Sequence, residues 1–504
     1  MTIATKSEPI LITGATGYIG GRLVPQLLER GYRVRCLARD VRRLSGRGWD
    51  EDPRVEIVQG DVLDPGSLAS AMQGCSAAYY LVHSLLAGEL AFESRDRVAA
   101  TNFAAAAEAA GLERIIYLGG LGHKAEKLSP HLESRHEVGD VLREGAVPVT
   151  ELRAAMIVGS GSASFEMLRS LVHKLPVMVC PRWVEVKTQP IAIRDVLAYL
   201  IGCLEAPATA NQTYDIGGPD VLTYREMMMR FATILGTRRW IVVVPVLTPR
   251  LSAYWVNLMT PVNAGMAFAL IESLQYETVC EEGKILDLVP IPRTGFENAC
   301  RWALDKVNQN AVETRWTNAS LPNRVERPAS VAPSPQGSPI RNQQRFEAEV
   351  PAAVLFDRVR RIGGHVGWYY ADFLWKIRGW MDRAIGGVGL RRGRRDPVAV
   401  RTGDAIDFWR VEDFVPGRRL LLHAEMIVPG EAWLEFRAEP IGEGRSELIQ
   451  TAYFKPSPFW GRAYWYACFP LHLFVFQGMA RGIIRAAERG APRPAAVAAP
   501  STSL

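Results

Sequence analysis

Cysteine is scarce in this chain, and its arrangement argues against two kinds of stabilising site. Seven cysteines are scattered over 504 residues, and no two of them form a Cys-x-x-Cys pair. This spacing argues against structural zinc and against a disulfide framework, so we expect no metal and a reducing compartment. A signal peptide is also missing, because the first expected strand begins within about ten residues of Met1. We therefore expect a cytoplasmic protein.

Long apolar runs are few, and only two approach the length of a membrane span. Residues 251–271 and 463–480 carry no charge, but prolines interrupt both runs, at Pro261 and Pro470. Both reach spanning length only marginally. We expect buried helices in both places, with peripheral membrane contact as the alternative.

Net charge is small as well, at +6 for the whole chain. Arginines crowd between Arg358 and Arg419, a pattern typical of a solvated loop, with attraction to anionic lipid as the alternative. No recognition motif accompanies this charge, so we expect no nucleic-acid partner.

The most informative stretch is an apolar run, residues 10–13, followed by three glycines spaced three apart and then by apolar residues at helical spacing. A strand, a tight glycine turn and a helix N-terminus leave backbone N–H groups pointing at a site suited to a pyrophosphate. An ordinary strand-to-helix turn is the alternative. We assign the cofactor's pyrophosphate to Gly14, Ala15, Thr16, Gly17, Tyr18, Ile19 and Gly20.

Strand and helix patterns alternate from residue 9 to about 150, which predicts an α/β doubly wound parallel sheet, the Rossmann arrangement. The second strand, residues 32–38, is closed by Arg39 and then by Asp40. An arginine at this place accommodates the 2′-phosphate of NADP, whereas an acidic residue would bind the 2′-hydroxyl of NAD. Arg42 and Arg43 follow, so we expect NADP, with NAD as the alternative.

The motif Thr-Gly-Ala-Thr-Gly-Tyr-Ile-Gly, residues 13–20, resembles the signature of extended and atypical short-chain dehydrogenase/reductases. The resemblance covers about the first 300 residues. It implies that Asp61, at the end of the third strand, faces the adenine amino group; capping of the helix over 65–72 is an alternative role. The remaining cofactor-binding assignments are Val62, Leu81, Val82, His83 and Asn102.

The sequence departs from that family at its catalytic positions. Residues 119–122 read Gly-Gly-Leu-Gly where the family has a serine, and His131-x-x-x-Arg135 replaces Tyr-x-x-x-Lys. Spacing of four places both side chains on one helical face. We expect His131 to act as the proton donor and Arg135 to position it and to hold the nicotinamide ribose. The alternatives are a solvated helix and a vestigial site that binds nucleotide without chemistry.

The composition divides the chain into domains. We expect an NAD(P)-binding domain at 1–312, with a substrate lobe at about 160–310 in which Asp195 caps a helix. A linker at 313–340, rich in Pro and Ser from Thr317 to Ser338, and a second domain at 341–490 would follow, then a disordered tail at 491–504.

The second domain shows strand patterns at 405–411, 419–427, 432–440 and 446–455, followed by a helix from about 461 to 489. This order resembles the helix-grip (START-like) α+β fold, in which a long helix covers a curved sheet around an apolar cavity. Seven tryptophans lie between Trp368 and Trp465, and we expect them in the core more than in a ligand cage.

These observations predict an NADP(H)-dependent reductase that acts on a carbonyl, a quinone or an activated double bond. The second domain would bind an apolar small molecule or lipid. Two other functions stay open: an NADP(H)-binding sensor or scaffold without turnover, and a peripheral membrane protein that handles lipid or quinone.

Overall fold

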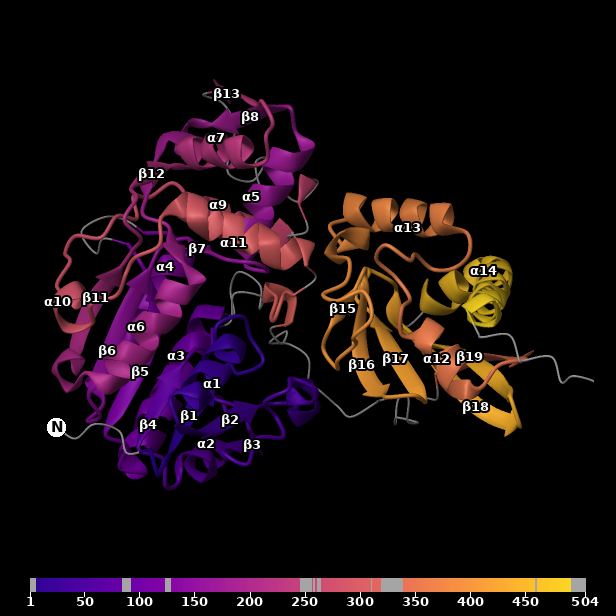
Figure 1. Cartoon of the computed structure of the whole chain (residues 1–504), viewed down its shortest axis with the longest axis horizontal. Coiled ribbons are helices and arrows are strands. Elements are labelled where there is room, and N and C mark those ends of the chain that lie inside the picture. The colour runs from indigo at the N-terminus through magenta and orange to yellow at the C-terminus, as the bar shows by residue number, and fades with distance from the viewer. Residues whose placement is uncertain are drawn as a thin grey trace, which may run out of the picture.

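The computed structural model describes two units joined near residue 318 (Figure 1). The described residues are 6–83, 92–122, 128–244, 256, 259–260, 264–309, 311–318, 339–457 and 460–490. The expected tail at 491–504, most of the expected linker, and residues 251–255, 257–258 and 261–263 of the apolar run at 251–271 lie outside these residues.

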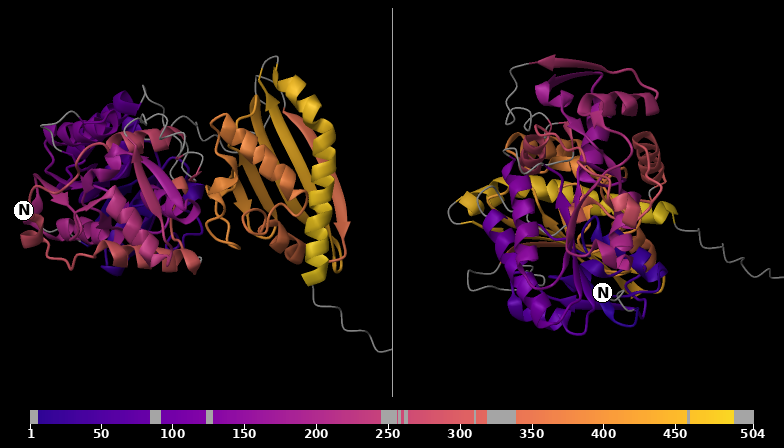
Figure 2. Two further views of the ribbon diagram at one scale, coloured as in Figure 1. Left: turned by 90° about the horizontal axis from the view of Figure 1, so that it is seen from above. Right: turned by 90° about the vertical axis from the view of Figure 1, so that its left-hand side faces the viewer.

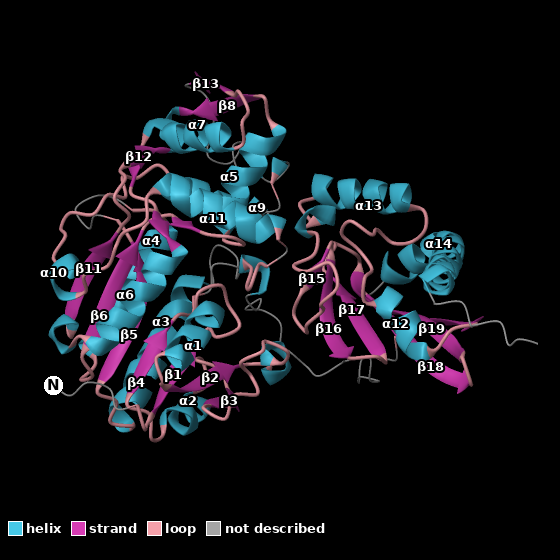
Figure 3. Ribbon diagram, in the orientation of Figure 1, coloured by secondary structure: helices cyan, strands magenta, loops and turns pink. Residues whose placement is uncertain are grey.

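The first unit is built on a seven-stranded parallel sheet, as the sequence predicts (Figure 3). The order is β11-β6-β5-β4-β1-β2-β3. After β3 the chain returns across the sheet to form β4 on the other side of β1, so the crossover lies between the neighbouring strands β1 and β4. The strands are β1 (Pro9–Thr13), β2 (Arg33–Ala38), β3 (Val55–Gln59), β4 (Ala77–Tyr80), β5 (Arg114–Gly120), β6 (Val149–Ala154) and β11 (Gln212–Ile216).

Helices cover both faces of this sheet, which explains why its central strands β1 and β4 are almost wholly apolar. Ile10 and Ile12 of β1 pack with α1 (Gly20–Glu29) and α6 (Ile193–Glu205). Leu11 points to the other face, where the helices are α2 (Pro65–Met72), α3 (Phe92–Ala109) and α4 (Pro130–Glu144).

A smaller lobe lies beyond the carboxyl ends of the strands (Figure 1). Its helices are α5 (Ala163–Lys174), α7 (Tyr224–Ile234), α9 (Ala264–Ser273) and α11 (Phe296–Asn308). The short α10 (Ile285–Leu288) packs instead beside β11 of the main sheet. The lobe's short strands are β7 (Ile157–Val158), β8 (Val177–Pro181), β9 (Lys187–Thr188), β10 (Ile191–Ala192), β12 (Leu222–Thr223) and β13 (Trp240–Val244).

Asp195 does not cap a helix, contrary to expectation. Helix α6 begins at Ile193, and Asp195 lies inside its first turn, 2% exposed. Its carboxylate accepts hydrogen bonds from the backbone N–H of Thr294 (2.6 Å) and from the Thr294 hydroxyl (2.8 Å). It therefore ties the lobe's last segment to the main sheet's helix.

The second unit is an antiparallel six-stranded sheet in the order β14-β19-β18-β17-β16-β15. The strands are β14 (Ile340–Ala348), β15 (Ala405–Ile406), β16 (Trp409–Val415), β17 (Arg419–Ala424), β18 (Gly430–Gly442) and β19 (Arg445–Pro456). The helices are α12 (Ala352–Val359), α13 (Asp372–Ala384) and the long α14 (Trp460–Gly490), which runs past the sheet (Figure 2).

The expected single strand at 405–411 is wrong. Asp407 has φ of +53°, and Ile406 pairs with Trp409, so a tight turn separates β15 from β16. The other three strands are present, with ends that differ by a few residues.

The tryptophans divide into two groups. Trp368, Trp375 and Trp409 surround Phe408, with ring centroids 5.7 to 6.2 Å from its ring, so these three belong to the core, as predicted. Trp380 and Trp460 are instead 64% and 77% exposed, and the prediction is wrong for them.

The apolar run at 463–480 lies in α14, and the expectation of a buried helix is wrong for one of its faces. Tyr466, Leu471 and Phe474 are exposed, whereas Val475, Phe476 and Met479 are buried. Among the described residues, α14 is the one helix long and apolar enough to cross a membrane, and a third of its most apolar window is buried.

Candidate cofactor and substrate site

The glycine turn after β1 has the geometry that the sequence predicts. Gly14 has φ of +71°, and a Cβ there would lie 2.7 Å from the Leu81 carbonyl oxygen. A Cβ at Gly20 would lie 2.4 Å from the Gly14 oxygen. Both positions therefore require glycine.

The turn leaves an anion site at the start of α1. No side chain caps the first amides of this helix at Ile19, and its first turn holds no acidic residue. Uncapped N–H groups at the positive end of a helix dipole attract phosphate. The residues therefore fit the pyrophosphate of a dinucleotide.

Thr13 joins the two strands that flank the crossover. Its hydroxyl donates to the Tyr79 carbonyl oxygen (2.9 Å) and accepts from the Leu81 backbone N–H (3.1 Å). Ligands of doubly wound sheets bind at this kind of crossover, beyond the carboxyl ends of the strands. Here a cleft of about 320 Å³ opens at that place.

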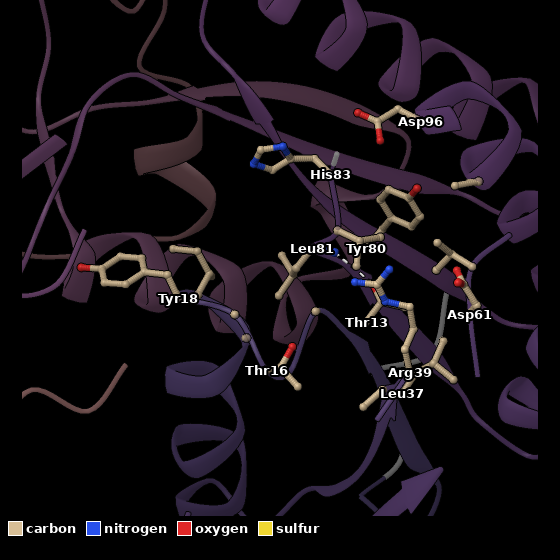
Figure 4. A pocket seen from close by; sticks show the side chains of 18 of the residues that line it. Thr13, Thr16, Tyr18, Leu37, Arg39, Asp61, Tyr80, Leu81, His83 and Asp96 are labelled. Atoms are coloured by element: carbon tan, nitrogen blue, oxygen red, sulfur yellow. Dashed lines mark hydrogen bonds between the residues drawn. The ribbon is translucent and has the colours of Figure 1, made fainter. Parts of the chain in front are cut away.

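Most of the residues assigned from the sequence line this cleft (Figure 4). Arg39 and Asp61 lie on one side of Thr16 and Tyr18 on the other, with His83 above Thr16 in this view. Because the predicted roles of Arg39 and Asp61 would place the adenosine half of the cofactor on their side, we call that side the adenosine end and the side of Tyr18 the nicotinamide end. The assigned residues that line the cleft are Gly14, Thr16, Gly17, Tyr18, Ile19, Gly20, Arg39, Asp61, Val62, Leu81, Val82 and His83.

Two assigned residues do not line it. Ala15 is fully buried behind the turn. The Asn102 side-chain amide donates to the carbonyl oxygens of Val62 (3.4 Å) and Leu63 (3.2 Å), so Asn102 supports the loop after β3 from behind.

Only one of the three arginines after β2 lines the cleft. Arg42 forms two hydrogen bonds with the Asp40 carboxylate (2.9 and 2.7 Å), and Arg43 is buried beside Gly403 of the second unit. Arg39 is half-buried in the cleft wall. The Asp40 carboxylate is therefore already bound by Arg42, so it is not available to accept a hydrogen bond from the ribose 2′-hydroxyl of NAD.

Asp61 does not cap α2, since Asp64 accepts from the Gly66 backbone N–H at that helix's N-terminus. Asp61 instead accepts from the Leu63 backbone N–H (3.1 Å) in the cleft wall. The adenine role of Asp61 stays a prediction.

A second cavity of about 340 Å³ joins the nicotinamide end of the cleft. Tyr18, Ile19, Leu81 and His83 line both spaces. The rest of the wall is mostly apolar and comes from α4 and the lobe, including Met167, Leu171, Trp183, Met227, Met228 and Leu274.

His131 and Arg135 both line this second cavity, one turn apart on α4. Burial first, and then the Arg135 charge, lower the pKa of His131 to about 3. The His83 ring lies 5.8 Å from the His131 ring, and burial also holds its pKa well below the ordinary value. Both rings are therefore neutral at pH 7. The role of His131 as the proton donor stays a prediction.

The position of Arg135 offers a reason for glycine at residue 120, in the segment where the resembled family has a serine. Its guanidinium donates to the Leu118 carbonyl oxygen (2.6 Å) at the carboxyl end of β5. A Cβ at Gly120 would lie 3.2 Å from Arg135 Cδ and 2.9 Å from Leu132 Cδ2. Glycine at this position makes room for the arginine.

Sequence reasoning missed several residues that line the cleft, and four of them lie outside the strands and loops from which the assignments came. Arg95 and Asp96 lie in the first turns of α3, which begins ten residues before the alanine-rich stretch that predicted it. Trp316 lies at the start of the expected linker, and Ala163 in the lobe. For Trp316 one signal was present in the sequence: a large aromatic residue is unusual in a linker, which suggests that it packs against another part of the protein.

Comparisons with known proteins agree with this geometry. Residues 14–162 match a family model described as NAD(P)H-binding, and residues 337–479 match a protein family of unknown function, DUF2867. The chain is 28% identical over 234 residues to a (4-alkanoyl-5-oxo-2,5-dihydrofuran-3-yl)methyl phosphate reductase of Streptomyces griseus, over 45% of this chain and 74% of that protein.

A ceramide reductase of Caulobacter vibrioides is 27% identical over 246 residues, covering 48% of this chain and 76% of that protein. Among solved structures, the triphenylmethane reductase of Citrobacter sp. complexed with NADP(H) is similar, with a TM-score of 0.47 and 21% identity over 58% of this chain and 99% of that one. The family match of residues 14–162 makes the N-terminal domain NAD(P)H-binding, its sheet has the Rossmann arrangement, and its sequence is similar to those of reductases.

Proposed function

We propose that this protein is an NADP(H)-dependent reductase of an apolar, conjugated substrate, either a quinone, an activated double bond or a conjugated carbonyl. One observation carries the proposal: the dinucleotide cleft and a mostly apolar cavity share Tyr18, Ile19, Leu81 and His83 as a common wall. A substrate in the second cavity would lie against the nicotinamide end of the first.

The bound cofactor supplies a hydride. The uncapped amides of α1 would hold its pyrophosphate, and Arg39 would pair with the 2′-phosphate of NADP(H). Arg135, held by Leu118, lies where it would orient the nicotinamide ribose and add positive charge near the reacting oxygen.

The neutral state of His131 narrows the substrate class. A neutral imidazole polarises an oxygen by hydrogen bonding, but it is a weak proton donor. An isolated ketone becomes a strongly basic alkoxide on reduction, whereas a quinone or conjugated substrate becomes a delocalised anion of far lower basicity. The second kind needs only the hydrogen bond that His131 can give.

The second domain supports a related role. Its antiparallel sheet is crossed by α14, with Trp465 stacked 5.4 Å from Phe454 of β19. This arrangement favours the helix-grip class, and we assign the domain to handling an apolar small molecule or lipid.

The test is NADPH oxidation by the purified full chain with a panel of quinones, enones and simple aldehydes. We expect turnover with the conjugated compounds and little with aldehydes. His131→Ala should lower turnover by about 100-fold. Glu133→Ala, an exposed residue of the same helix, is the matched control and should have no effect.

A non-catalytic NADP(H) sensor is the second candidate, favoured by glycine and histidine at the positions of the family's serine and tyrosine. Tight NADPH binding without oxidation of any compound in the panel would support the sensor and refute the reductase.

A further inference from the structure

Helix α13 presents its apolar side chains outward. Phe373, Ile377, Trp380, Met381 and Ile385 at its end are between 52% and 64% exposed, and their spacing places them on one face. The inward face carries the polar anchor: the buried Asp382 carboxylate accepts from the backbone N–H groups of Gly389 (2.9 Å) and Ile427 (2.7 Å). This is the reverse of an ordinary surface helix.

The first half of α14 has a similar outward stripe. Trp460, Tyr466, Leu471 and Phe474 are between 48% and 77% exposed. Further along the helix the exposed positions become polar and charged, at Gln477, Arg481, Arg485 and Glu488. The apolar stripe therefore ends within the helix.

The two stripes adjoin. Tyr370, just before α13, contacts Phe474 edge-on at 5.3 Å. Arg378 of α13 interacts with Tyr464 of α14 and donates to the carbonyl oxygen of Ile427 (2.9 Å), which is itself 48% exposed. These contacts place the first half of α14 next to α13, with the two helix axes at an angle to each other (Figure 1). Together, the exposed residues form one surface, the aromatic face.

Most charges on the two helix segments that carry the aromatic face are positive, and the exposed Asp372 at the start of α13 is the exception. Lys376 and Arg462 are exposed beside the stripes, and Arg383 is half-buried. Asp382, the single acidic residue between 373 and 385, is buried, and residues 460–476 contain none. Aromatic side chains bordered by lysine and arginine suit the headgroup region of an anionic bilayer.

We propose that the aromatic face docks this protein on the surface of an anionic lipid bilayer. The helices lie on the bilayer and do not cross it, because α14 also supplies Trp465, Phe476 and Met479 to the domain core, which spanning would expose. The proposal does not depend on turnover, since docking can be measured without substrate.

The experiment is flotation of the full chain with phosphatidylcholine vesicles, with and without phosphatidylglycerol. We expect binding to the anionic vesicles and release at high salt. Trp380→Ser should weaken binding about tenfold, because docking affinity follows the apolar area buried. Trp240→Ser, a 70% exposed tryptophan of the first domain, is the matched control and should bind as the parent does.

A second pair of variants tests whether the positive charges beside the aromatic face contribute to vesicle binding. Lys376→Glu should weaken binding to anionic vesicles more than Arg481→Glu, which lies on the charged half of α14. Equal losses would show that overall charge sets the binding and would overturn the placement. Unchanged melting temperature and NADPH affinity show that each variant is folded.

Three results would overturn the proposal. The first is failure to float with either vesicle, and the second is protein that stays with the membrane through a high-salt and alkaline wash, which indicates a spanning α14. The third is a dimer that Trp380→Ser dissociates without any vesicle binding, which would assign the face to a second copy of this chain.

Discussion

Arg39 should decide which dinucleotide this protein prefers. It is the one of the three arginines after β2 that lines the cleft, at the adenosine end. A charge-assisted hydrogen bond contributes about 1.5–3 kcal/mol, or roughly ten- to 150-fold in affinity. Because Arg39 is half exposed and solvent screens its charge, we expect the lower end for Arg39→Ala, about a tenfold weaker NADPH complex.

NADH lacks the 2′-phosphate, so Arg39→Ala should leave its affinity nearly unchanged. Calorimetric titration of the full chain with each nucleotide measures both. Arg33→Ala is the matched control, because Arg33 lies at the other end of β2, pairs with Glu56 and does not line the cleft. Equal losses for NADPH and NADH, or a larger NADPH loss in Arg33→Ala, would refute the assignment.

Other predictions follow from the same geometry. Gly20→Ala should abolish binding of both nucleotides in a titration, because its Cβ would meet the Gly14 oxygen at 2.4 Å. The pKa of His131 is lowered to about 3 in the folded protein, so as the pH falls below 6.5 the unfolded chain binds a proton that the folded chain does not. The free energy of unfolding should therefore decrease between pH 6.5 and 3. In His131→Gln the melting temperature should depend less on pH over this range. Asp382→Ala should lower the free energy of unfolding by about 1–3 kcal/mol in chemical denaturation, because a buried N–H group of Gly389 and a partly buried one of Ile427 lose their acceptor. Limited proteolysis should cut first between Thr317 and Ser338, and only the N-terminal fragment should then bind nucleotide.

The sequence predicted the parallel sheet and the glycine turn because both leave local signals. A strand buried on both faces is apolar along its whole length, and a turn that needs positive φ or a close backbone approach needs glycine. The cleft residues of the glycine turn follow from these two rules. They are Gly14, Thr16, Gly17, Tyr18, Ile19 and Gly20.

What could not be predicted depends on tertiary contacts. The sequence does not show that Asp40 binds Arg42 and leaves Arg39 to the cleft, or that Asn102 supports a loop. The pattern of α13 has apolar residues on more than one face, so only packing decides that Trp375 is buried and Trp380 exposed. The turn at Asp407 carries no glycine and so gave no signal.

Burial links the chemistry of the site to the surface of the second domain. In the proposed reductase, the apolar wall that lowers the pKa of His131 to about 3 would also favour substrates that dissolve poorly in water. Such substrates concentrate in lipid, so a reductase with this pocket meets them more often at a bilayer than in solution. A domain whose exposed aromatic residues lie beside lysine and arginine would bring the pocket to that source, and the same hydrophobic effect would then act on substrate and protein alike.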